Sequence, residues 1–295
     1  MLDRQQNIET ETFIDDIERL GIVALQNAFR VHNELGTNGL ADVPVLPHKS
    51  TIRGDLQAEN AVIDTLVNGP YLFLIHSEEN GIVKIKNGDR PLDYLAVLDG
   101  IDGSKSYKEN FGKGRYATMF GIFSNTDPRY GDYLFSGIME HATGRLFYAV
   151  KGKGSFVLKD GVKTRIHCST KEKLDPRTSV LNADTNFDRV FHVHVVGQVT
   201  DKLPGFDVRL GDSSAAHYAD LARGAVEAVI ESTRKDNLEI GDAYGLITEA
   251  GGTMITLDGT NLGDQKYLSF GQDDHVVVIS VANASIAKDL LVRIV

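Results

Sequence analysis

A single cysteine, Cys168, occurs in the 295 residues of the sequence. One thiol cannot form an intrachain disulfide, and it cannot supply the ligands of a cysteine-rich zinc site. The sequence also lacks any apolar run close to the roughly 18 residues that a membrane-spanning helix needs, and residues 1–18 are polar and acidic, unlike a secretory signal. We therefore expect a soluble protein of a reducing compartment, the cytoplasm, with no membrane partner.

Positive charge is also scarce, because 31 Lys and Arg residues face 41 Asp and Glu residues, which gives a net charge of −10. This balance disfavours nucleic acid as a partner, since binding to phosphate backbones needs cationic surfaces. A phosphorylated small molecule is compatible with an acidic enzyme if bound metal ions supply the local positive charge. Hydrophobic residues make up 42% of the chain, which is enough for a sizeable globular core.

The most informative stretch is residues 95–104, LAVLDGIDGS, in which an apolar run ends at two carboxylates, two glycines and a hydroxyl. The apolar run predicts a buried strand. Asp99 and Asp102 flank a tight turn and can direct their oxygens into one small volume, where protons or a hard cation such as Mg²⁺ must offset their repulsion. Ser104 can cap a short helix whose N–H groups face an anion. An ordinary solvated Asp-Gly turn is the alternative.

The rest of the chain shows two patterns. Residues 1–165 combine amphipathic helices with an antiparallel meander, whereas residues 166–295 alternate strands with helices. We expect an N-terminal α+β domain with most metal ligands and a C-terminal α/β domain that completes the active site. The expected helices are residues 12–34, 55–67, 184–190, 213–223, 239–250 and 284 onward, and the expected strands are 71–76, 116–123, 133–140, 145–150, 155–158, 179–181, 206–210, 225–230, 252–257 and 276–281.

Two further segments carry acids at the ends of expected elements. Glu78 and Glu79 follow the strand at 71–76, and they either join the Asp99 turn in one metal site or begin a solvated loop. Glu239 begins the expected helix at 239–250, where a carboxylate can face a ligand or act as an ordinary capping acid. Residues 36–47 are rich in Gly, Asn and Pro, which predicts a loop and a candidate mobile flap.

Taken together, these segments resemble the inositol monophosphatase family. That family belongs to the lithium-sensitive, magnesium-dependent phosphatases, with the fructose-1,6-bisphosphatases and the 3′-phosphoadenosine-5′-phosphate phosphatases. The resemblance covers nearly the whole chain and implies a layered αβαβα sandwich. The family motifs G-E-E, D-P-[IL]-D-G-[ST], G-S-[AS]-A and W-D-x-A-[AG]…E-A-G-G resemble, in this order, residues 77–79, 99–104, 209–215 and 238–252.

By this resemblance, specific residues acquire expected roles. The implied metal ligands are Glu78, Asp99, Asp102, Glu239 and the carbonyl of Ile101. The implied catalytic residues are Asp55, Ser104 and Glu78, with Ser104 and Asp55 paired to orient the attacking water. The implied contacts to phosphate and substrate come from Gly103, Ser104, Ser213, Ser214 and Glu239. The implied cofactor is Mg²⁺, with Mn²⁺ as an alternative, and the implied assembly is a homodimer.

The expected activity is that of a Mg²⁺-dependent phosphomonoesterase, which hydrolyses a small phosphorylated polyol or sugar with a metal-activated water. Inositol monophosphate is the first candidate substrate, and 3′-phosphoadenosine-5′-phosphate and fructose 1,6-bisphosphate are the alternatives. A non-catalytic phosphate-binding protein on the same fold is the alternative of another class.

Two departures from the motifs motivate that last alternative. Glu239 replaces an Asp, which displaces the carboxylate, and Gly100 replaces a Pro, which predicts a looser turn. Asp242, one helical turn after Glu239, either substitutes for it or faces solvent.

Overall fold

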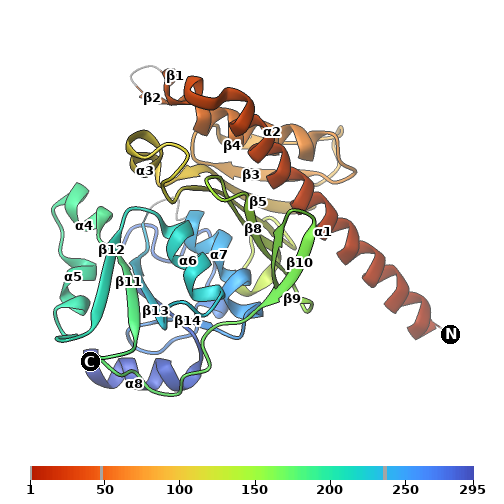
Figure 1. The fold of residues 1–295 in the computed structure, drawn as a ribbon. Helices are drawn as coiled ribbons and strands as arrows, with labels where there is room; N and C mark the ends of the chain where they lie inside the picture. The colour runs from red at the N-terminus through yellow and green to blue at the C-terminus, as the bar shows by residue number, and fades with distance from the viewer. Residues whose placement is uncertain (1, 47–48, 235–237) are drawn as a thin grey trace.

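The structure is a computed structural model that describes residues 2–46, 49–234 and 238–295. Helices and strands stack in five layers, in which two β-sheets alternate with three layers of helices (Figure 1). The layered αβαβα sandwich expected from the sequence is therefore confirmed. Within the described residues, every helix is too short or too polar to traverse a lipid bilayer.

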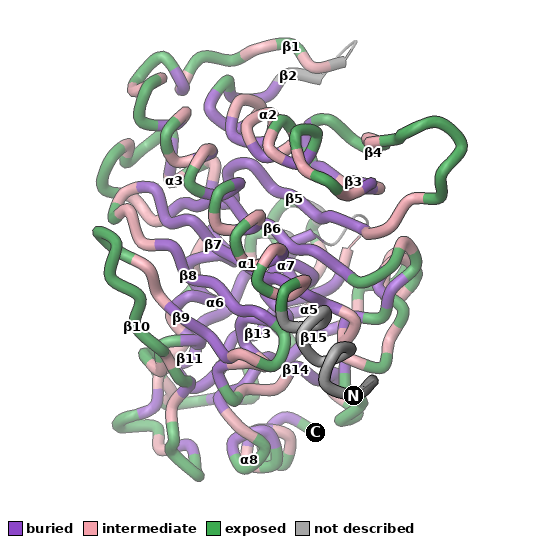
Figure 2. The backbone as a smooth tube through the Cα atoms, turned by 90° about the vertical axis from the view of Figure 1, so that its right-hand side faces the viewer, coloured by how far each residue is buried: buried purple, intermediate pink, exposed green. Residues whose placement is uncertain are grey.

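An eight-stranded sheet forms the second layer, with its strands in the order β10-β9-β8-β7-β6-β5-β3-β4. Strands β3 and β5 run parallel, and the other neighbours are antiparallel. Figure 2 shows the middle of this sheet buried, because helices cover both of its faces. The strands are β3 (Phe73–Ser77), β4 (Gly81–Lys84), β5 (Tyr94–Asp102), β6 (Ala117–Phe123), β7 (Tyr133–Glu140), β8 (Arg145–Val150), β9 (Gly154–Lys159) and β10 (Val162–Ile166).

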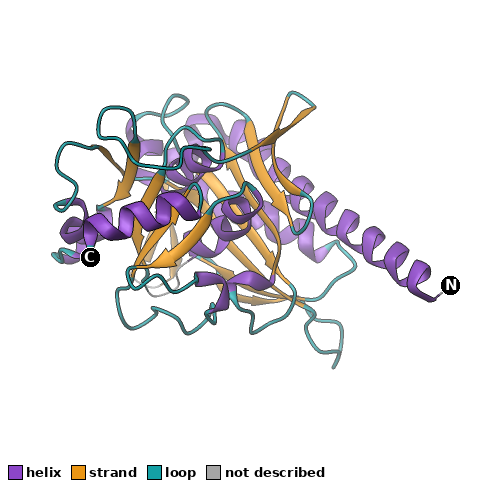
Figure 3. Ribbon diagram, turned by 90° about the horizontal axis from the view of Figure 1, so that it is seen from below, coloured by secondary structure: helices purple, strands orange, loops and turns teal. Residues whose placement is uncertain are grey.

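Two helices, α1 (Leu2–Leu35) and α2 (Arg53–Val67), cover the outer face of this sheet. A Cβ on Gly21 would lie 2.6 Å from the ring of Phe135, so glycine is what allows α1 to approach β7 closely. The N-terminal end of α1 projects beyond the sheet (Figures 1 and 3). The fully buried positions of α1 recur at helical spacing and are Ile17, Ala24, Leu25 and Ala28.

A five-stranded sheet forms the fourth layer, in the order β12-β11-β13-β15-β14. Helices α5 (Val195–Thr200) and α8 (Ala284–Ile294) pack their apolar residues against its outer face, and α4 (Asn186–Phe191) precedes α5. The strands are β11 (Val180–Asp184), β12 (Asp207–Gly211), β13 (Ala228–Ser232), β14 (Thr253–Thr256) and β15 (Val277–Val281).

Two helices lie between the sheets, α6 (Ser214–Ala222) and α7 (Leu238–Glu249). Because α7 packs against strands of the first sheet as well as against β14, the two halves of the chain share one hydrophobic cluster. The division into domains 1–165 and 166–295 remains a prediction. A short helix, α3 (Ser104–Glu109), follows β5 directly.

The expectation of a loop over residues 36–47 was wrong for the part that the structure describes. A 3₁₀ helix, η1 (Gly36–Leu40), is followed by β1 (Asp42–Leu46), which pairs with β2 (Lys49–Ile52). Pro47 lies outside the described residues. Both strands are edges of a two-stranded sheet, where a proline such as Pro44 is tolerated. Strands β4 and β10 and helix α5 were not predicted, because each is short and has no strong apolar period.

Glu249, the acid of the E-A-G-G segment, has a structural role. One oxygen of its carboxylate accepts hydrogen bonds from the Tyr133 hydroxyl at 2.8 Å and the Gly152 amide at 2.7 Å. The other oxygen accepts from the Gly154 amide at 2.8 Å. The end of α7 therefore holds the turn between β8 and β9, and joins the middle helix layer to the first sheet.

We predict that Glu249→Gln lowers the free energy of unfolding by about 1–3 kcal/mol, because an amide NH₂ placed opposite a backbone N–H leaves a donor unsatisfied. Urea denaturation monitored by circular dichroism measures the change. Glu172→Gln, at an exposed position, is the matched control and should leave stability within about 0.5 kcal/mol of the wild type. Equal stabilities of the two variants would contradict the prediction.

Candidate metal centre

The site is built on an irregularity at the end of β5. The pairing of β5 with β6 is regular up to Asp99 opposite Met119, and it resumes at Asp102 opposite Ala117, so Thr118 alone faces two residues of β5. In a regular strand, residues three apart point to opposite faces of the sheet. The extra residue in this β-bulge brings Asp102 back to the side of Asp99.

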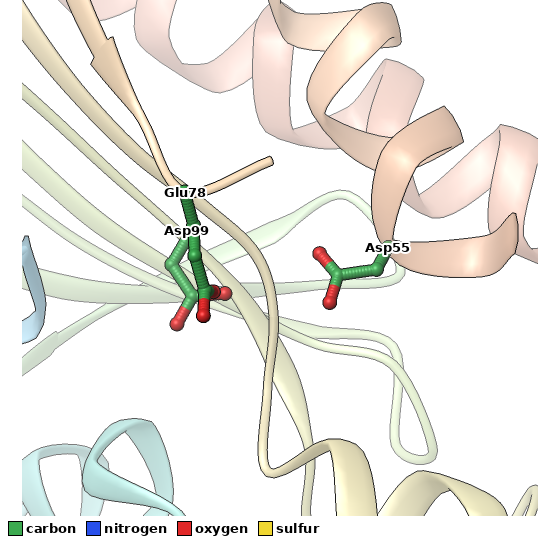
Figure 4. A group of neighbouring side chains, drawn as sticks. All are labelled: Asp55, Glu78 and Asp99. Atoms are coloured by element: carbon green, nitrogen blue, oxygen red, sulfur yellow. The ribbon is translucent and has the colours of Figure 1, made fainter. Parts of the chain in front are cut away.

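A first group of carboxylates gathers beside the bulge (Figure 4). Glu78 follows β3, which runs parallel to β5, and its amide donates to the carbonyl of Leu98 at 3.1 Å. Asp55 comes from the first turn of α2. Asp55, Glu78 and Asp99 each offer an oxygen within 4.8 Å of the others. The side chain of Glu78 is exposed, and its role as a metal ligand remains a prediction.

A second group shares Asp99 with the first. Asp99, Asp102 and Glu239 also offer oxygens within 4.8 Å of one another. Glu239 lies in the first turn of α7, as the sequence predicted. One oxygen of Asp102 accepts hydrogen bonds from the Ser213 hydroxyl at 2.6 Å and from the Ala215 amide at 2.8 Å. Carboxylates from both halves of the chain thus meet at one place.

Burial and mutual repulsion make these groups hard to ionise together. Burial, followed by the charge of Glu78, holds the pKa values of Asp55 and Asp99 well above their usual range. Burial also raises the pKa of Asp102 to about 6, although the Ser213 hydroxyl opposes that shift. Among the described residues, Oδ1 of Asp99 is buried with no hydrogen-bond partner. Carboxylate oxygens in this arrangement fit a hard divalent cation.

Glu59 organises the turn that carries Glu78, and sequence reasoning missed it. Its buried carboxylate accepts hydrogen bonds from the Ser77 hydroxyl, from the Glu79 amide, and from both the backbone amide and the side chain of Asn80. Burial nevertheless raises the pKa of Glu59. The signal was present in α2, because Asp55 and Glu59 occupy the same helical stripe as buried Val62 and the helix is otherwise apolar there.

The expected water-orienting pair, Ser104 and Asp55, lies on either side of the same short segment. The Ser104 hydroxyl donates to the carbonyl of Ile101 at 3.0 Å, and Oδ1 of Asp55 accepts from the amide of Ile101 at 3.0 Å. Both side chains therefore contact the residue whose carbonyl is an expected metal ligand. The catalytic role of the pair remains a prediction.

Other predicted residues sit deeper than expected. The Ser214 hydroxyl donates to Glu231 at 3.0 Å, next to Asp184, in a buried cluster under the site. The side chain of His217, in α6, is buried as well. Arg234 forms an ion pair with Glu239 and approaches Glu231 at 3.6 Å. The sequence also makes Arg234 and Lys235, which precede Glu239, candidates for neutralising a second phosphate, but Lys235 lies outside the described residues.

Asp242 does not face solvent, so that interpretation was wrong. Its carboxylate is fully buried, and a Cβ on Gly121 of β6 would lie 2.8 Å from its Oδ1. Within the described parts of the chain, both of its oxygens lack a hydrogen-bond partner, and burial raises its pKa well above the usual range. The absence of a side chain at Gly121 is what makes room for this carboxyl group.

Comparisons with known proteins agree with this arrangement. The family model for the inositol monophosphatase family matches residues 53–294. The chain is 28% identical over 221 residues to a bifunctional NADP phosphatase/NAD kinase of Methanococcus maripaludis, covering 71% of this chain but only 37% of that protein. It is 29% identical over 213 residues to a fructose-1,6-bisphosphatase/inositol-1-monophosphatase of Methanothermobacter thermautotrophicus, covering 68% and 69% of the two chains.

A solved structure supports the fold independently of sequence. The inositol monophosphatase from Anabaena superposes with a TM-score of 0.68 at 20% identity, over 97% of this chain and 96% of that one. The match of the family model extends from the start of α2, which carries Asp55, to the end of α8, and it includes both groups of carboxylates. The chain belongs to the inositol monophosphatase family.

Proposed function

We propose that the protein is a metal-dependent phosphomonoesterase that uses Mg²⁺, with Mn²⁺ as an alternative. The observation that carries this proposal is the pair of carboxylate groups joined at Asp99, each with its oxygens within 4.8 Å of one another. Two neighbouring oxygen sites match the two-cation arrangement of many phosphoryl-transfer enzymes. The relatives described above are phosphatases, one of them also an NAD kinase, which supports the same reaction class.

In this proposal, Glu78, Asp99 and the carbonyl of Ile101 hold one cation, and Asp99, Asp102 and Glu239 hold another. When bound, such cations supply a water of lowered pKa and neutralise the phosphate charge. The chain's own groups perform the positioning. Ser213 and the Ala215 amide fix one oxygen of Asp102 and leave the other for a ligand.

Ser104 and Asp55 are proposed to orient the attacking water from the other side of the Ile101 carbonyl. Each side chain is already fixed by a hydrogen bond to the peptide groups of Ile101, which limits the geometries that a water between them can adopt. The amides of Gly103 and Ser104, at the start of α3, are proposed to bind the phosphate. Glu239 is proposed to contact the rest of the substrate, whereas the buried Ser214 hydroxyl is already engaged by Glu231.

The proposed substrate is a small phosphorylated polyol or sugar, with inositol monophosphate first. 3′-Phosphoadenosine 5′-phosphate and fructose 1,6-bisphosphate are the alternatives, and the bifunctional relative adds NADP to the compounds worth testing. We further propose a cytoplasmic homodimer. Phosphate release from this panel with Mg²⁺ or Mn²⁺ tests the proposal, and metal binding without any phosphate release would favour a non-catalytic phosphate-binding protein.

Asp99→Asn should reduce kcat by roughly 10²–10³-fold or more, because both carboxylate groups lose the residue that they share. Phosphate release at saturating Mg²⁺ measures the effect. Glu172→Gln, exposed and remote from β5, is the control and should retain full activity. Turnover of Asp99→Asn close to that of the wild type would refute the assignment of the centre.

Glu239→Asp is expected to preserve or increase turnover, because it restores the shorter acid of the family motif. Glu239 forms an ion pair with Arg234. The shorter aspartate must still reach the oxygens of Asp99 and Asp102 for the second carboxylate group to persist. Steady-state kinetics with a Mg²⁺ titration compare the two side chains. A large loss of activity would instead show that this site has adapted to glutamate.

The raised pKa of Asp102 predicts a pH-dependent stability of the metal-free protein. A carboxyl whose pKa is about 6 in the folded protein, against 3.8 for an unperturbed aspartate, stabilises the fold fully below pH 3.8. This contribution is lost as the pH rises through about 6. With a chelator present, the Tm of the wild type should therefore fall relative to the Tm of Asp102→Asn as the pH rises from about 4 to about 7. A constant difference in Tm across this range would contradict the prediction.

A further inference from the structure

A single peptide group in the β-bulge is held at both of its ends. The carbonyl of Gly100 accepts a hydrogen bond from the Thr118 hydroxyl at 2.7 Å. The amide of Ile101, which belongs to the same peptide plane, donates to Oδ1 of Asp55 at 3.0 Å. Thr118 acts from β6 and Asp55 acts from α2, so the plane is fixed between the sheet and the outer helix layer.

Few other features restrain the backbone around this peptide group. Gly100 has no side chain to restrict its backbone, and a Cβ at that position would lie 2.4 Å from both the carbonyl and Oδ1 of Asp55. A bulge also interrupts the ladder hydrogen bonds that hold a regular strand in place. The orientation of Asp99, of the Ile101 carbonyl and of Asp102 therefore depends on contacts made by side chains.

The Thr118 hydroxyl is itself held by His141, which follows β7. Nε2 of His141 lies 2.9 Å from Oγ1 of Thr118. Because the single hydroxyl hydrogen of Thr118 points to Gly100, the proton of this second bond must come from Nε2, which fixes the histidine as its Nε2–H tautomer. His141 thus donates to Thr118, and Thr118 donates to the bulge.

The ring of His141 is positioned by aromatic neighbours from two other parts of the chain. It stacks on His32 of α1 with ring centroids 4.2 Å apart, and it lies 6.0 Å from the ring of Tyr116. Its backbone amide donates to the carbonyl of Tyr116 at 3.2 Å. Burial and the neighbouring His32 hold the pKa of His141 well below its usual range, in keeping with a neutral donor.

We propose that Thr118 and His141 are positioning residues of the metal centre, which hold the Gly100–Ile101 peptide so that Asp99, the Ile101 carbonyl and Asp102 keep one geometry. Neither side chain belongs to the two carboxylate groups, and both act through the peptide. The proposal rests on the proposed function, because it takes these oxygens as metal ligands. Outer residues that orient metal ligands typically change metal affinity by 10–100-fold when replaced.

Calorimetric titration of the full chain with Mn²⁺ tests the proposal directly. Thr118→Val removes the hydroxyl at nearly constant volume, and we expect it to weaken Mn²⁺ binding by roughly 10-fold. Thr118→Ser retains the hydroxyl and should stay within about threefold of the wild type. Thr256→Val is the matched control, because it removes a buried strand hydroxyl in the other sheet and should leave Mn²⁺ affinity unchanged.

A double-mutant cycle separates positioning from general destabilisation. His141→Gln keeps an N–H donor and should retain most of the Mn²⁺ affinity. His141→Phe has no donor for Thr118 and should bind Mn²⁺ more weakly. In the Thr118→Val background, His141→Phe should cause little further loss, because the hydrogen bond to Thr118 is already absent. If Thr118→Val is poorly folded, the His141 pair of variants decides the question alone.

Steady-state kinetics should likewise show weaker metal binding with a smaller effect on catalysis. For Thr118→Val, the Mg²⁺ concentration at half-maximal rate should rise by roughly the factor seen for Mn²⁺, with kcat at saturating Mg²⁺ changed less. Mn²⁺ affinities of Thr118→Val and His141→Phe within twofold of the wild type would overturn the proposal. A wild-type chain that binds no Mn²⁺ would instead overturn the proposed function itself.

Discussion

Repulsion among buried carboxylates is the constraint on which the site depends. Asp55, Asp99 and Asp102 are nearly inaccessible to solvent, and Glu78 and Glu239 bring further negative charge within a few ångströms. Such a cluster is costly unless every charge is paired or protonated. The protein satisfies some of these oxygens with its own donors, and leaves the rest facing one another across a small volume.

The buried acids of the site differ in the hydrogen bonds that they accept from the protein, and this difference indicates different roles. Glu59 accepts several hydrogen bonds and shapes the turn that carries Glu78. Asp102 is divided, with one oxygen bound by Ser213 and Ala215. Asp99 keeps a buried oxygen with no partner among the described residues. A buried oxygen without a partner among the described residues therefore belongs to the carboxylate that the two groups share, as expected if its partner is an ion.

The sequence predicted much of this because the decisive signals were local. Asp99 and Asp102 follow their apolar run directly, Glu78 follows a strand, and Glu239 begins a helix, so elements and acids could be recognised together. The five-layer arrangement came from the resemblance to a family and not from periodicity. The pairing of β1 with β2 was missed because the proline of β1 and the glycines of the preceding 3₁₀ helix are also typical of loops.

What the sequence could not supply are contacts between residues far apart in the chain. Asp55 and Ile101 are separated by 46 positions, and Thr118 and Gly100 by 18. Threonine and histidine in these places carry no pattern that distinguishes them from other buried polar residues. Asp242 illustrates the same limit, because the room for its carboxyl group in α7 depends on a glycine in strand β6. A bulge likewise leaves no signature in an apolar run, although it decides which way Asp102 points.

The shared position of Asp99 has a thermodynamic consequence. Any two cations bound by these groups would compete for, and polarise, the same carboxylate, so their binding free energies cannot be independent. Occupancy of either position then changes the affinity of the other by one common factor, whichever ion binds first. A single side chain at the end of β5 would therefore couple the two positions in the proposed centre.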